Sequence, residues 1–408
     1  MEPASIFQAC ARHLALSVDT TIYGTVYPWP EMICQLFGHC AHNKYIDEAV
    51  GMLVRQMYRP KWEPSELLRI LHNAHSSDPV LQKSELILCT QPMVICIMLR
   101  ALVETPMLIY QAFPLVGATP VEHMDTILLN FREMIRSPRR SAFVVYSEFL
   151  AVQFEHQVGL RPFCIRPNSL YATQSGSYNP DRQDPRIMVS RLAGWARDGA
   201  HAMVNMVEEL SMRDLRPGTR LRFVFMGMSR PPSETVAGIA TPFGYPELRR
   251  FRAAVYFPWD MGMLLFSELY NMGVPILLPS RAWIANIIKR MLEYTDFGWW
   301  QARHESMVTV PGVRGTGLPP WFGANSTISH ILDLYDLTDF VRWPKVTTFA
   351  NLPDLMVQLL ALDFDAASTE MLRWQQASLP ISLDILGSAL GALLVGAEPP
   401  EIGASSCV

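Results

Sequence analysis

The stretch that decides the fold covers residues 253–279 and reads AAVYFPWDMGMLLFSELYNMGVPILLP. It opens with a short apolar run, 253–257, that predicts a buried strand, and continues into residues 262–272, which predict a helix. A second apolar run, 275–278, follows Gly273 and predicts the next strand. A strand, a helix and a strand in this order form a βαβ unit, and such units build parallel sheets.

The same alternation continues through the rest of the C-terminal half. Strands are predicted at 186–190 and 221–226, and helices at 201–212 and 283–292. Residues 334–362 return to helical character after an irregular stretch. The pattern predicts an α/β lobe of the Rossmann type around a parallel sheet.

The N-terminal half repeats this organisation less regularly. Its predicted strands are 86–89, 106–110, 143–146 and 162–165, with an earlier strand at 21–26. Between them, Thr119 and Pro120 start a helix that runs to about residue 136, and Ser147 starts another.

A polar, turn-rich segment, 172–184, separates the two halves and is predicted to be a linker. The expected domains are therefore 1–174 and 175–408, the second ending in a helical tail. The expected fold class is α/β, with two Rossmann-like lobes facing a cleft.

The composition limits the classes of function. The chain has 408 residues, of which 50% are hydrophobic, and a formal net charge of -4, so it can bury large cores and is poorly suited to bind nucleic acid. Its seven cysteines form no C-x-x-C pair, which argues against a zinc site or a disulfide scaffold. Cys89 and Cys96 lie in apolar runs and are expected to be buried, reduced thiols, which leans towards cytosol or nucleus.

No targeting segment is evident in this sequence, and the location of the protein stays open. The first residues lack the basic start and apolar block of a signal peptide. The apolar segment 381–396 contains Asp384 and is short for a membrane span. We expect it to be a packed terminal helix.

Two acidic residues frame the central helix of the opening stretch. Asp260 and Glu268 are eight positions apart, which corresponds to roughly 12 Å along a helix axis. Carboxylates so far apart cannot form a dyad or share one metal ion, but they could contact the two ends of an extended ligand. Between them, Met261 and Gly262 begin the helix, where free amide groups and the helix dipole favour a phosphate. Met263–Phe266 predict a buried helix, so Glu268 is expected to need a ligand or a basic partner.

This block resembles the donor-site signature of GT-B glycosyltransferases, in which an acidic residue precedes a glutamate by eight positions. Asp260, Glu268, Gly273 and Pro275 match the signature, and Pro258, followed by Trp259, fits before it. The resemblance implies that Glu268 binds the ribose of a nucleotide-sugar and that Asp260 lies near its hexose. Asp260 stands where the family usually has glutamate. No cofactor or metal is expected besides the co-substrate, a UDP- or GDP-sugar.

Further residues resemble the phosphate-binding parts of the same family. The resemblance assigns diphosphate contacts to Arg191, and to Arg197 one position out of step with the family lysine. Gly227 would let the backbone approach the nucleotide, and Arg230 follows it. Residues 334–362 resemble the tail of uncharacterised protist and algal glycosyltransferase-like proteins.

The acceptor side and the catalytic base are less well defined. The N-terminal lobe is expected to hold the acceptor, which can be a glycan, protein or lipid, and its candidate base is Glu148 at a strand-to-helix turn. Asp260 is the other candidate catalytic residue, and the acidic pair leans slightly towards a retaining reaction. Asp363 and Asp365 spell a D-x-D, but they follow an amphipathic stretch and are interpreted as a surface helix exit.

Two alternatives to glycosyl transfer stay open. One is a nucleotide-sugar epimerase of the same architecture, which would need several acid/base side chains around the sugar. The other is a catalytically silent homologue that binds a sugar nucleotide or a partner, which the aspartate at 260 and the missing lysine near 197 keep open. The base, the sugar and the oligomeric state are not predicted.

Overall fold

The computed structural model describes residues 2–23, 39–55, 60–90, 92–112, 115, 119–136, 141–181, 186–190, 209, 221–225, 244–258, 261, 264–294, 309–315 and 326–395. The chain forms two compact units. Unit 1 comprises Met1–Pro167, Phe297–Gly323 and Ser378–Val408, and unit 2 comprises Asn168–Asp296 and Ala324–Ala377. One boundary after residue 174 was expected from the sequence, whereas the chain returns to unit 1 twice after first leaving it.

Unit 1 is built on a parallel sheet, named the N-sheet below, with four strands in the described residues, in the order β1-β2-β3-β4. The strands are β1 (Ile87–Cys89), β2 (Met107–Gln111), β3 (Ser141–Val145) and β4 (Phe163–Cys164). All three pairings between its neighbouring strands are parallel, as at Ile109 opposite Phe143. The four predicted strands from 86 to 165 are therefore confirmed, and so is the parallel sheet. Of the earlier predicted strand at 21–26, only Ile22 forms a bridge within the described residues.

The helices of unit 1 precede the N-sheet or connect its strands. They are α1 (Glu2–His13), α3 (Lys44–Arg55), α4 (Pro64–Ser77), α5 (Pro79–Lys83), α6 (Met93–Arg100), the 3-10 turn η1 (Val121–His123), α7 (Met124–Ile135) and α8 (Glu148–Val158). The core gathers around Phe131 of α7, Phe143 of β3 and Phe154 of α8, whose ring centroids lie 5.1–6.0 Å apart. The helix predicted from residue 119 thus begins as a 3-10 turn.

Unit 2 is built on a second parallel sheet, named the C-sheet, with five strands in the part of the chain that is described, in the order β6-β5-β7-β8-β9. The strands are β5 (Arg186–Val189), β6 (Arg222–Phe225), β7 (Ala253–Val255), β8 (Ile276–Pro279) and β9 (Thr347–Phe349). The first four were predicted. Strand β9 was not, because it lies inside the stretch 334–362 that was predicted to be helical throughout. Lys345, with a φ of 65°, turns the chain into a short run of β-branched residues that pairs with β8.

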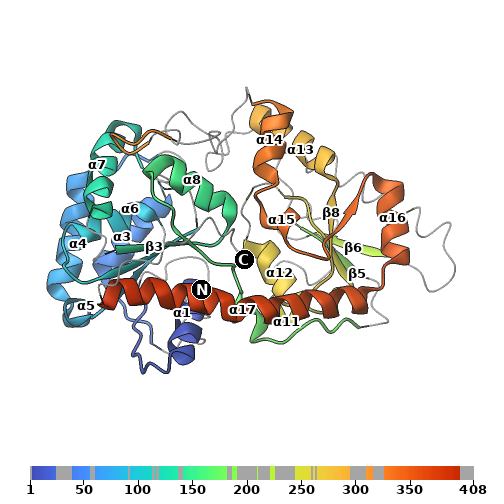
Figure 1. The fold of residues 1–408 in the computed structure, drawn as a ribbon, viewed down its shortest axis with the longest axis horizontal. Coiled ribbons are helices and arrows are strands. Elements are labelled where there is room, and N and C mark those ends of the chain that lie inside the picture. Colours follow the sequence, from blue (N-terminus) through green and yellow to red (C-terminus); the bar gives the residue numbers. More distant parts are fainter. Residues whose placement is uncertain are drawn as a thin grey trace, which may run out of the picture. The chain divides into compact units, whose positions relative to one another are not determined.

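The helices of unit 2 cover both faces of the C-sheet. They are α9 (Leu170–Thr173), α11 (Tyr245–Leu248), α12 (Leu264–Asn271), α13 (Arg281–Tyr294), α14 (Ile328–Tyr335), α15 (Asp339–Arg342) and α16 (Leu352–Ala361). Leu355 and Leu359 of α16 join one apolar cluster with Val189 and Val255. Because neighbouring strand residues face opposite sides, Tyr256 points the other way and packs on Phe266 of α12, with ring centroids 5.7 Å apart. Figure 1 shows α13 and α14 side by side in this unit. The helix predicted at 201–212 lies outside the described residues, apart from residue 209.

The segment that was predicted to be a linker, 172–184, packs against unit 2 where it is described. The backbone N–H of Tyr178 donates to the carbonyl of Met272 at 2.7 Å, and that of Asn179 donates to the carbonyl of Arg249 at 3.0 Å. The Tyr178 hydroxyl donates to the carbonyl of Arg252 at 2.8 Å. These bonds make the segment part of unit 2.

The long helix α17 (Phe364–Val395) contributes to both units, with residues up to 377 in unit 2 and the rest in unit 1. Within the described residues it is the one helix long and apolar enough to cross a membrane, and a core helix passes the same test. Most of its buried residues recur every three or four positions, namely Phe364, Ser368, Met371, Gln375, Ser378, Ser382, Leu386, Ala389 and Leu393, and Leu383 and Leu390 are buried beside them. Such a stripe is typical of a helix packed on one side, as was expected for its second half.

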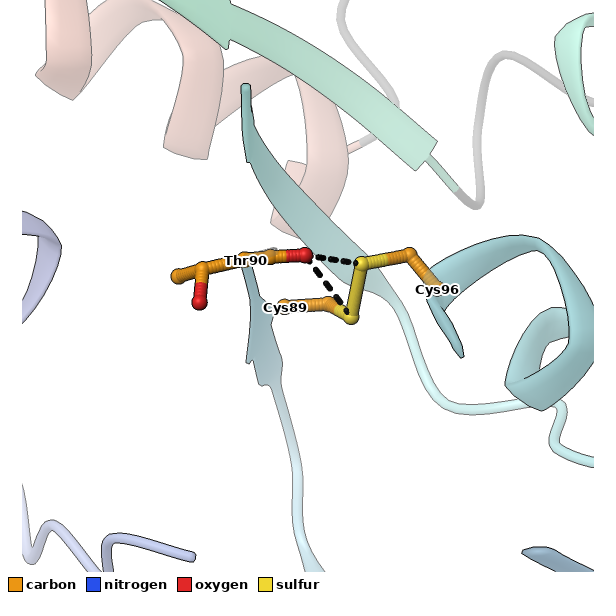
Figure 2. The surroundings of a disulfide bond; sticks show 3 residues. All are labelled: Cys89, Thr90 and Cys96. Atoms are coloured by element: carbon orange, nitrogen blue, oxygen red, sulfur yellow. Dashed lines mark hydrogen bonds between the residues drawn. A yellow bond between two sulfur atoms is a disulfide. The ribbon is translucent and has the colours of Figure 1, made fainter. Parts of the chain in front are cut away.

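The cysteines differ from the expectation. Cys89 and Cys96 form a disulfide, and Cys40 and Cys164 are also disulfide-bonded, so the prediction of reduced thiols and of no disulfides was wrong. Figure 2 shows both sulfur atoms of the Cys89–Cys96 bond turned towards the carbonyl oxygen of Thr90, which lies 2.8 Å from Sγ of Cys96. The apolar runs hid the pairing, because β1 and α6 bring the two residues together through a turn. Disulfides are typical of oxidising compartments, so the lean towards cytosol or nucleus loses its basis.

Candidate functional site

The order of strands in the C-sheet reverses at β5. From β5 the chain passes to β6 on one side, and then to β7 on the other side of β5. The connections that leave β5 and β7 therefore diverge, and the carboxyl ends of these two strands form a topological switch point. In open parallel sheets, ligands bind in the crevice beyond the strand ends at such a point.

The described residues at this switch point are tightly fixed. Ser190 follows β5 directly and is buried, and its backbone N–H donates to the carbonyl of Val255 at 2.9 Å. Its hydroxyl oxygen accepts a 2.8 Å hydrogen bond from the backbone N–H of Phe257, which follows β7. Ser190 therefore joins the ends of β5 and β7 and sets the start of both loops.

Two of the predicted donor-site residues are described next to this point. Pro258 and Met261 are both buried, beyond the carboxyl end of β7. Seven others lie outside the described residues and are Trp259, Asp260, Gly262, Arg191, Arg197, Gly227 and Arg230. In the chain, Arg191 directly follows Ser190, and Asp260 comes two positions after Pro258.

The predicted ribose-binding residue, Glu268, lies in the second turn of α12 and is partly buried. Its Oε1 accepts a hydrogen bond from the Tyr171 hydroxyl at 2.5 Å and another from the Tyr245 hydroxyl at 3.0 Å. Burial raises the pKa of Glu268, and the two hydrogen bonds oppose that shift in part. A ligand or a basic partner was expected for this carboxylate, and its hydrogen-bond partners in the described residues are two tyrosines.

Tyr171 and Tyr245 were not predicted from the sequence. They stand 97 and 23 residues from Glu268 in the chain, on the short helices α9 and α11. Their rings also contact each other edge to face, with centroids 5.7 Å apart. No spacing rule connects residues so distant in sequence, so only the fold could bring them together.

The candidate base of the N-terminal half, Glu148, occupies the first position of α8, beyond the carboxyl end of β3. The hydroxyl of Ser147 caps this helix by accepting a hydrogen bond from the backbone N–H of Leu150 at 3.3 Å. The carboxylate of Glu148 lies 2.5 Å from the guanidinium of Arg161, which also pairs with Glu155 at 2.9 Å. The ion pair gives Glu148 a structural role, and its role as a base stays a prediction.

The D-x-D motif formed by Asp363 and Asp365 lies at the start of a helix. Asp363 is exposed and caps the start of α17, where its carboxylate accepts a hydrogen bond from the backbone N–H of Ala366 at 2.9 Å. Asp365 is exposed in the first turn of the same helix. The motif therefore lies between two helices and not at a strand end. Across the described residues, no group of three or more His, Cys, Asp or Glu side chains could hold a metal ion.

Comparison of the chain with protein-family models and with curated proteins finds no match.

Proposed function

We propose that this protein is a glycosyltransferase of the GT-B type that binds a nucleotide-sugar donor in unit 2 and needs no metal ion. The observation that carries the proposal is the position of the acidic signature. Residues 258–275 follow β7, one of the two strands at the switch point of the C-sheet, where a parallel sheet binds its ligand. The two lobes that face a cleft in such enzymes are part of the proposal.

Each residue of the donor site has a proposed task. Glu268 accepts hydrogen bonds from the ribose, and Asp260 lies near the hexose. The backbone around Met261 and Gly262, at the start of α12, binds the diphosphate through amide groups and the helix dipole. Arg191, with Arg197 or Arg230, neutralises the phosphate charge, since guanidinium groups form paired hydrogen bonds with phosphate. Gly227 lets the chain approach the nucleotide.

The acceptor is proposed to bind in unit 1 at the carboxyl edge of the N-sheet. Described polar side chains at or just beyond the carboxyl ends of its strands include Thr90, Gln111, Ser147, Glu148 and Arg166. Arg166 is buried and donates to the hydroxyl of Ser378. With Glu148 ion-paired, a retaining reaction that needs no acceptor base agrees better with the proposal.

The test is a donor panel. The purified protein is incubated with UDP-, GDP- and ADP-sugars, with and without EDTA, and release of the nucleoside diphosphate is measured. The proposal predicts turnover with one class of donor, unchanged by EDTA and abolished in Glu268→Ala. No turnover and no binding across the panel would refute it.

A silent homologue that binds the donor without turning it over is the second candidate. The ion pair between Glu148 and Arg161 favours it, because it engages the one candidate base that the sequence offers at the N-sheet edge. Binding of a nucleotide-sugar without turnover, with and without a mixture of glycan acceptors, would support this candidate over transfer.

A further inference from the structure

We propose that Tyr171 and Tyr245 are positioning residues that hold the carboxylate of Glu268 so that its second oxygen accepts a hydrogen bond from one ribose hydroxyl. The inference rests on the proposed function and deepens it, because it says how the nucleoside part of the donor is recognised. It follows from the contacts around one carboxylate.

Both tyrosine hydroxyls donate to the same oxygen of that carboxylate. The distances to Oε1 of Glu268 are 2.5 Å from Tyr171 and 3.0 Å from Tyr245. Two donors on one oxygen fix the plane of the carboxylate, because rotation about its last bond would break both bonds. Within the described residues neither tyrosine uses Oε2, which keeps its capacity to accept.

The tyrosines are themselves held in place. Tyr171 lies two positions after Ser169, the buried N-cap residue of α9, whose φ of 45° and ψ of 41° put it in the left-handed region that residues other than glycine rarely adopt. The Ser169 hydroxyl lies 3.1 Å from the hydroxyl of Ser267, the neighbour of Glu268 on α12. The strained turn and this bond fix α9 against α12, so that Tyr171 reaches Glu268. Strain of this kind persists where the surrounding structure enforces it.

The contact between the two rings adds the second constraint. Tyr245 on α11 packs edge to face on Tyr171, and the backbone of the same region accepts a hydrogen bond from Asn179 at Arg249. Three separate segments, α9, α11 and α12, therefore meet at one carboxylate. A helix surface that needed only a solvated glutamate would not require them.

Among the described contacts, the tyrosines leave Oε2 as the oxygen of Glu268 that can accept from the ribose. A carboxylate whose two oxygens are both available can accept hydrogen bonds from both ribose hydroxyls. In Glu268 the tyrosines already donate to Oε1, so Oε2 is the oxygen that accepts from the ribose. We therefore expect unequal roles for the 2′ and 3′ hydroxyls. Removal of the one that donates to Glu268 weakens binding roughly ten-fold, as for loss of a hydrogen bond to a charged group.

The experiment measures binding of UDP and GDP by isothermal titration calorimetry to the full-length chain and to Tyr171→Phe, Tyr245→Phe and Tyr178→Phe. Tyr178→Phe is the matched control, because it removes a tyrosine hydroxyl that donates to a backbone carbonyl in the same unit and has no bond to Glu268. Each of the first two variants is expected to bind the nucleotide roughly ten-fold more weakly, and the control within about two-fold.

The 2′-deoxy and 3′-deoxy forms of the tighter-binding nucleotide separate positioning from mere structural support. One of these forms lacks the hydroxyl that donates to Glu268. For that form, Tyr171→Phe and Tyr245→Phe are expected to bind as tightly as the wild type, because the hydrogen bond that the tyrosines position is already missing. The inference would be overturned if the tyrosine variants lost affinity for both deoxy forms, or if they bound the nucleotide as tightly as the Tyr178→Phe control. In either case, binding of the nucleotide by the wild-type chain would leave the proposed function in place. A wild-type chain that binds neither UDP nor GDP would overturn the proposed function itself. Circular dichroism checks the folding of each variant, and the two tyrosines give two independent trials.

Discussion

The N-sheet and the C-sheet are both parallel, but they differ in the order of their strands. The described N-sheet runs β1-β2-β3-β4, so successive connections all move in one direction. The C-sheet runs β6-β5-β7-β8-β9 and reverses at β5. A crevice for a ligand forms beyond the strand ends where the order reverses. Of the described strands, those of the C-sheet alone therefore define a ligand position by topology.

The carboxyl edges of the two sheets are also fixed by different means. At the N-sheet, a disulfide joins Cys89 at the end of β1 to Cys96 in α6. At the C-sheet, the hydroxyl of Ser190 joins the ends of β5 and β7 through one hydrogen bond. The disulfide restrains the loop after β1 covalently, whereas the Ser190 hydrogen bond restrains the starts of the loops after β5 and β7 without a covalent link. Under the proposed function, the nucleotide binds at the carboxyl edge of the C-sheet and not at that of the N-sheet, and the following changes test this difference.

The largest effect is expected from the disulfide. Replacing Cys89 and Cys96 together by Ala should lower the free energy of unfolding by about 2.5 kcal/mol, because the short closed loop no longer restricts the unfolded chain. Chemical denaturation under non-reducing conditions measures the loss. In the wild type, the chain is cleaved between the two cysteines without reduction, and mass spectrometry shows whether the two peptides stay linked. Nucleotide affinity should stay unchanged. Separate, unlinked peptides for these two cysteines would contradict the assignment.

The next effect compares the carboxylate of Glu268 in unit 2 with that of Glu148 in unit 1. Glu268→Gln should weaken binding of the nucleoside diphosphate roughly thirty-fold, because a hydrogen bond to a charged group is lost. Glu148→Gln, at the edge of the N-sheet, should change this affinity by less than about two-fold, since its charge pairs with Arg161. Titration calorimetry compares the two variants. Equal losses would remove the distinction between the sheets.

A smaller effect is expected at the switch point. Ser190→Ala should destabilise unit 2 by about 1–2 kcal/mol, because the backbone N–H of Phe257 loses its acceptor in a buried position. It should also weaken nucleotide binding, since both loops start at this bond. Thermal unfolding with and without nucleotide separates the two losses. A variant as stable as the wild type would show that the bond does not hold the strand ends.

The smallest effect is a gain of thermal stability in Glu268→Gln, the same variant that is expected to bind the nucleotide more weakly. Burial raises the pKa of Glu268 above its value in the unfolded chain, so folding favours the protonated form and the ionised form costs stability at neutral pH. Gln carries no charge, and Glu268→Gln should therefore melt slightly above the wild type at pH 7 to 8. The difference should shrink as the pH falls through the folded pKa. Calorimetry over this range checks it, and a variant less stable at pH 7 would show that the tyrosine bonds outweigh burial.

Periodicity in the sequence predicted most of the two sheets, and its failures have physical reasons. Strands such as β2 and β8 are runs of buried apolar residues, which any parallel sheet requires. Strand β9 is short and stands between helices, so that its pairing with β8 decides its structure. The chain's two returns to unit 1 depend on tertiary contacts that no local pattern carries.

The candidate site was predictable in part. The spacing of Asp260 and Glu268 was visible because both lie in one βαβ unit. The partners of Glu268 were not, since Tyr171 and Tyr245 come from segments far away in the chain. The pairing of Cys89 with Cys96 was hidden for a different reason: the two residues are only seven positions apart, but one ends β1 and the other lies in α6, and both stand in apolar runs. Local patterns therefore gave the motif, and the fold gave its surroundings.

The central claim is that a nucleoside diphosphate binds at the reversal of the C-sheet. A crystal structure of the protein soaked with UDP or GDP tests it most directly. We predict ligand density beyond the carboxyl ends of β5 and β7, with the ribose beside Oε2 of Glu268 and the phosphates near the start of α12. Density at the edge of the N-sheet near Glu148, or a wild-type site that stays empty at saturating nucleotide, would contradict it.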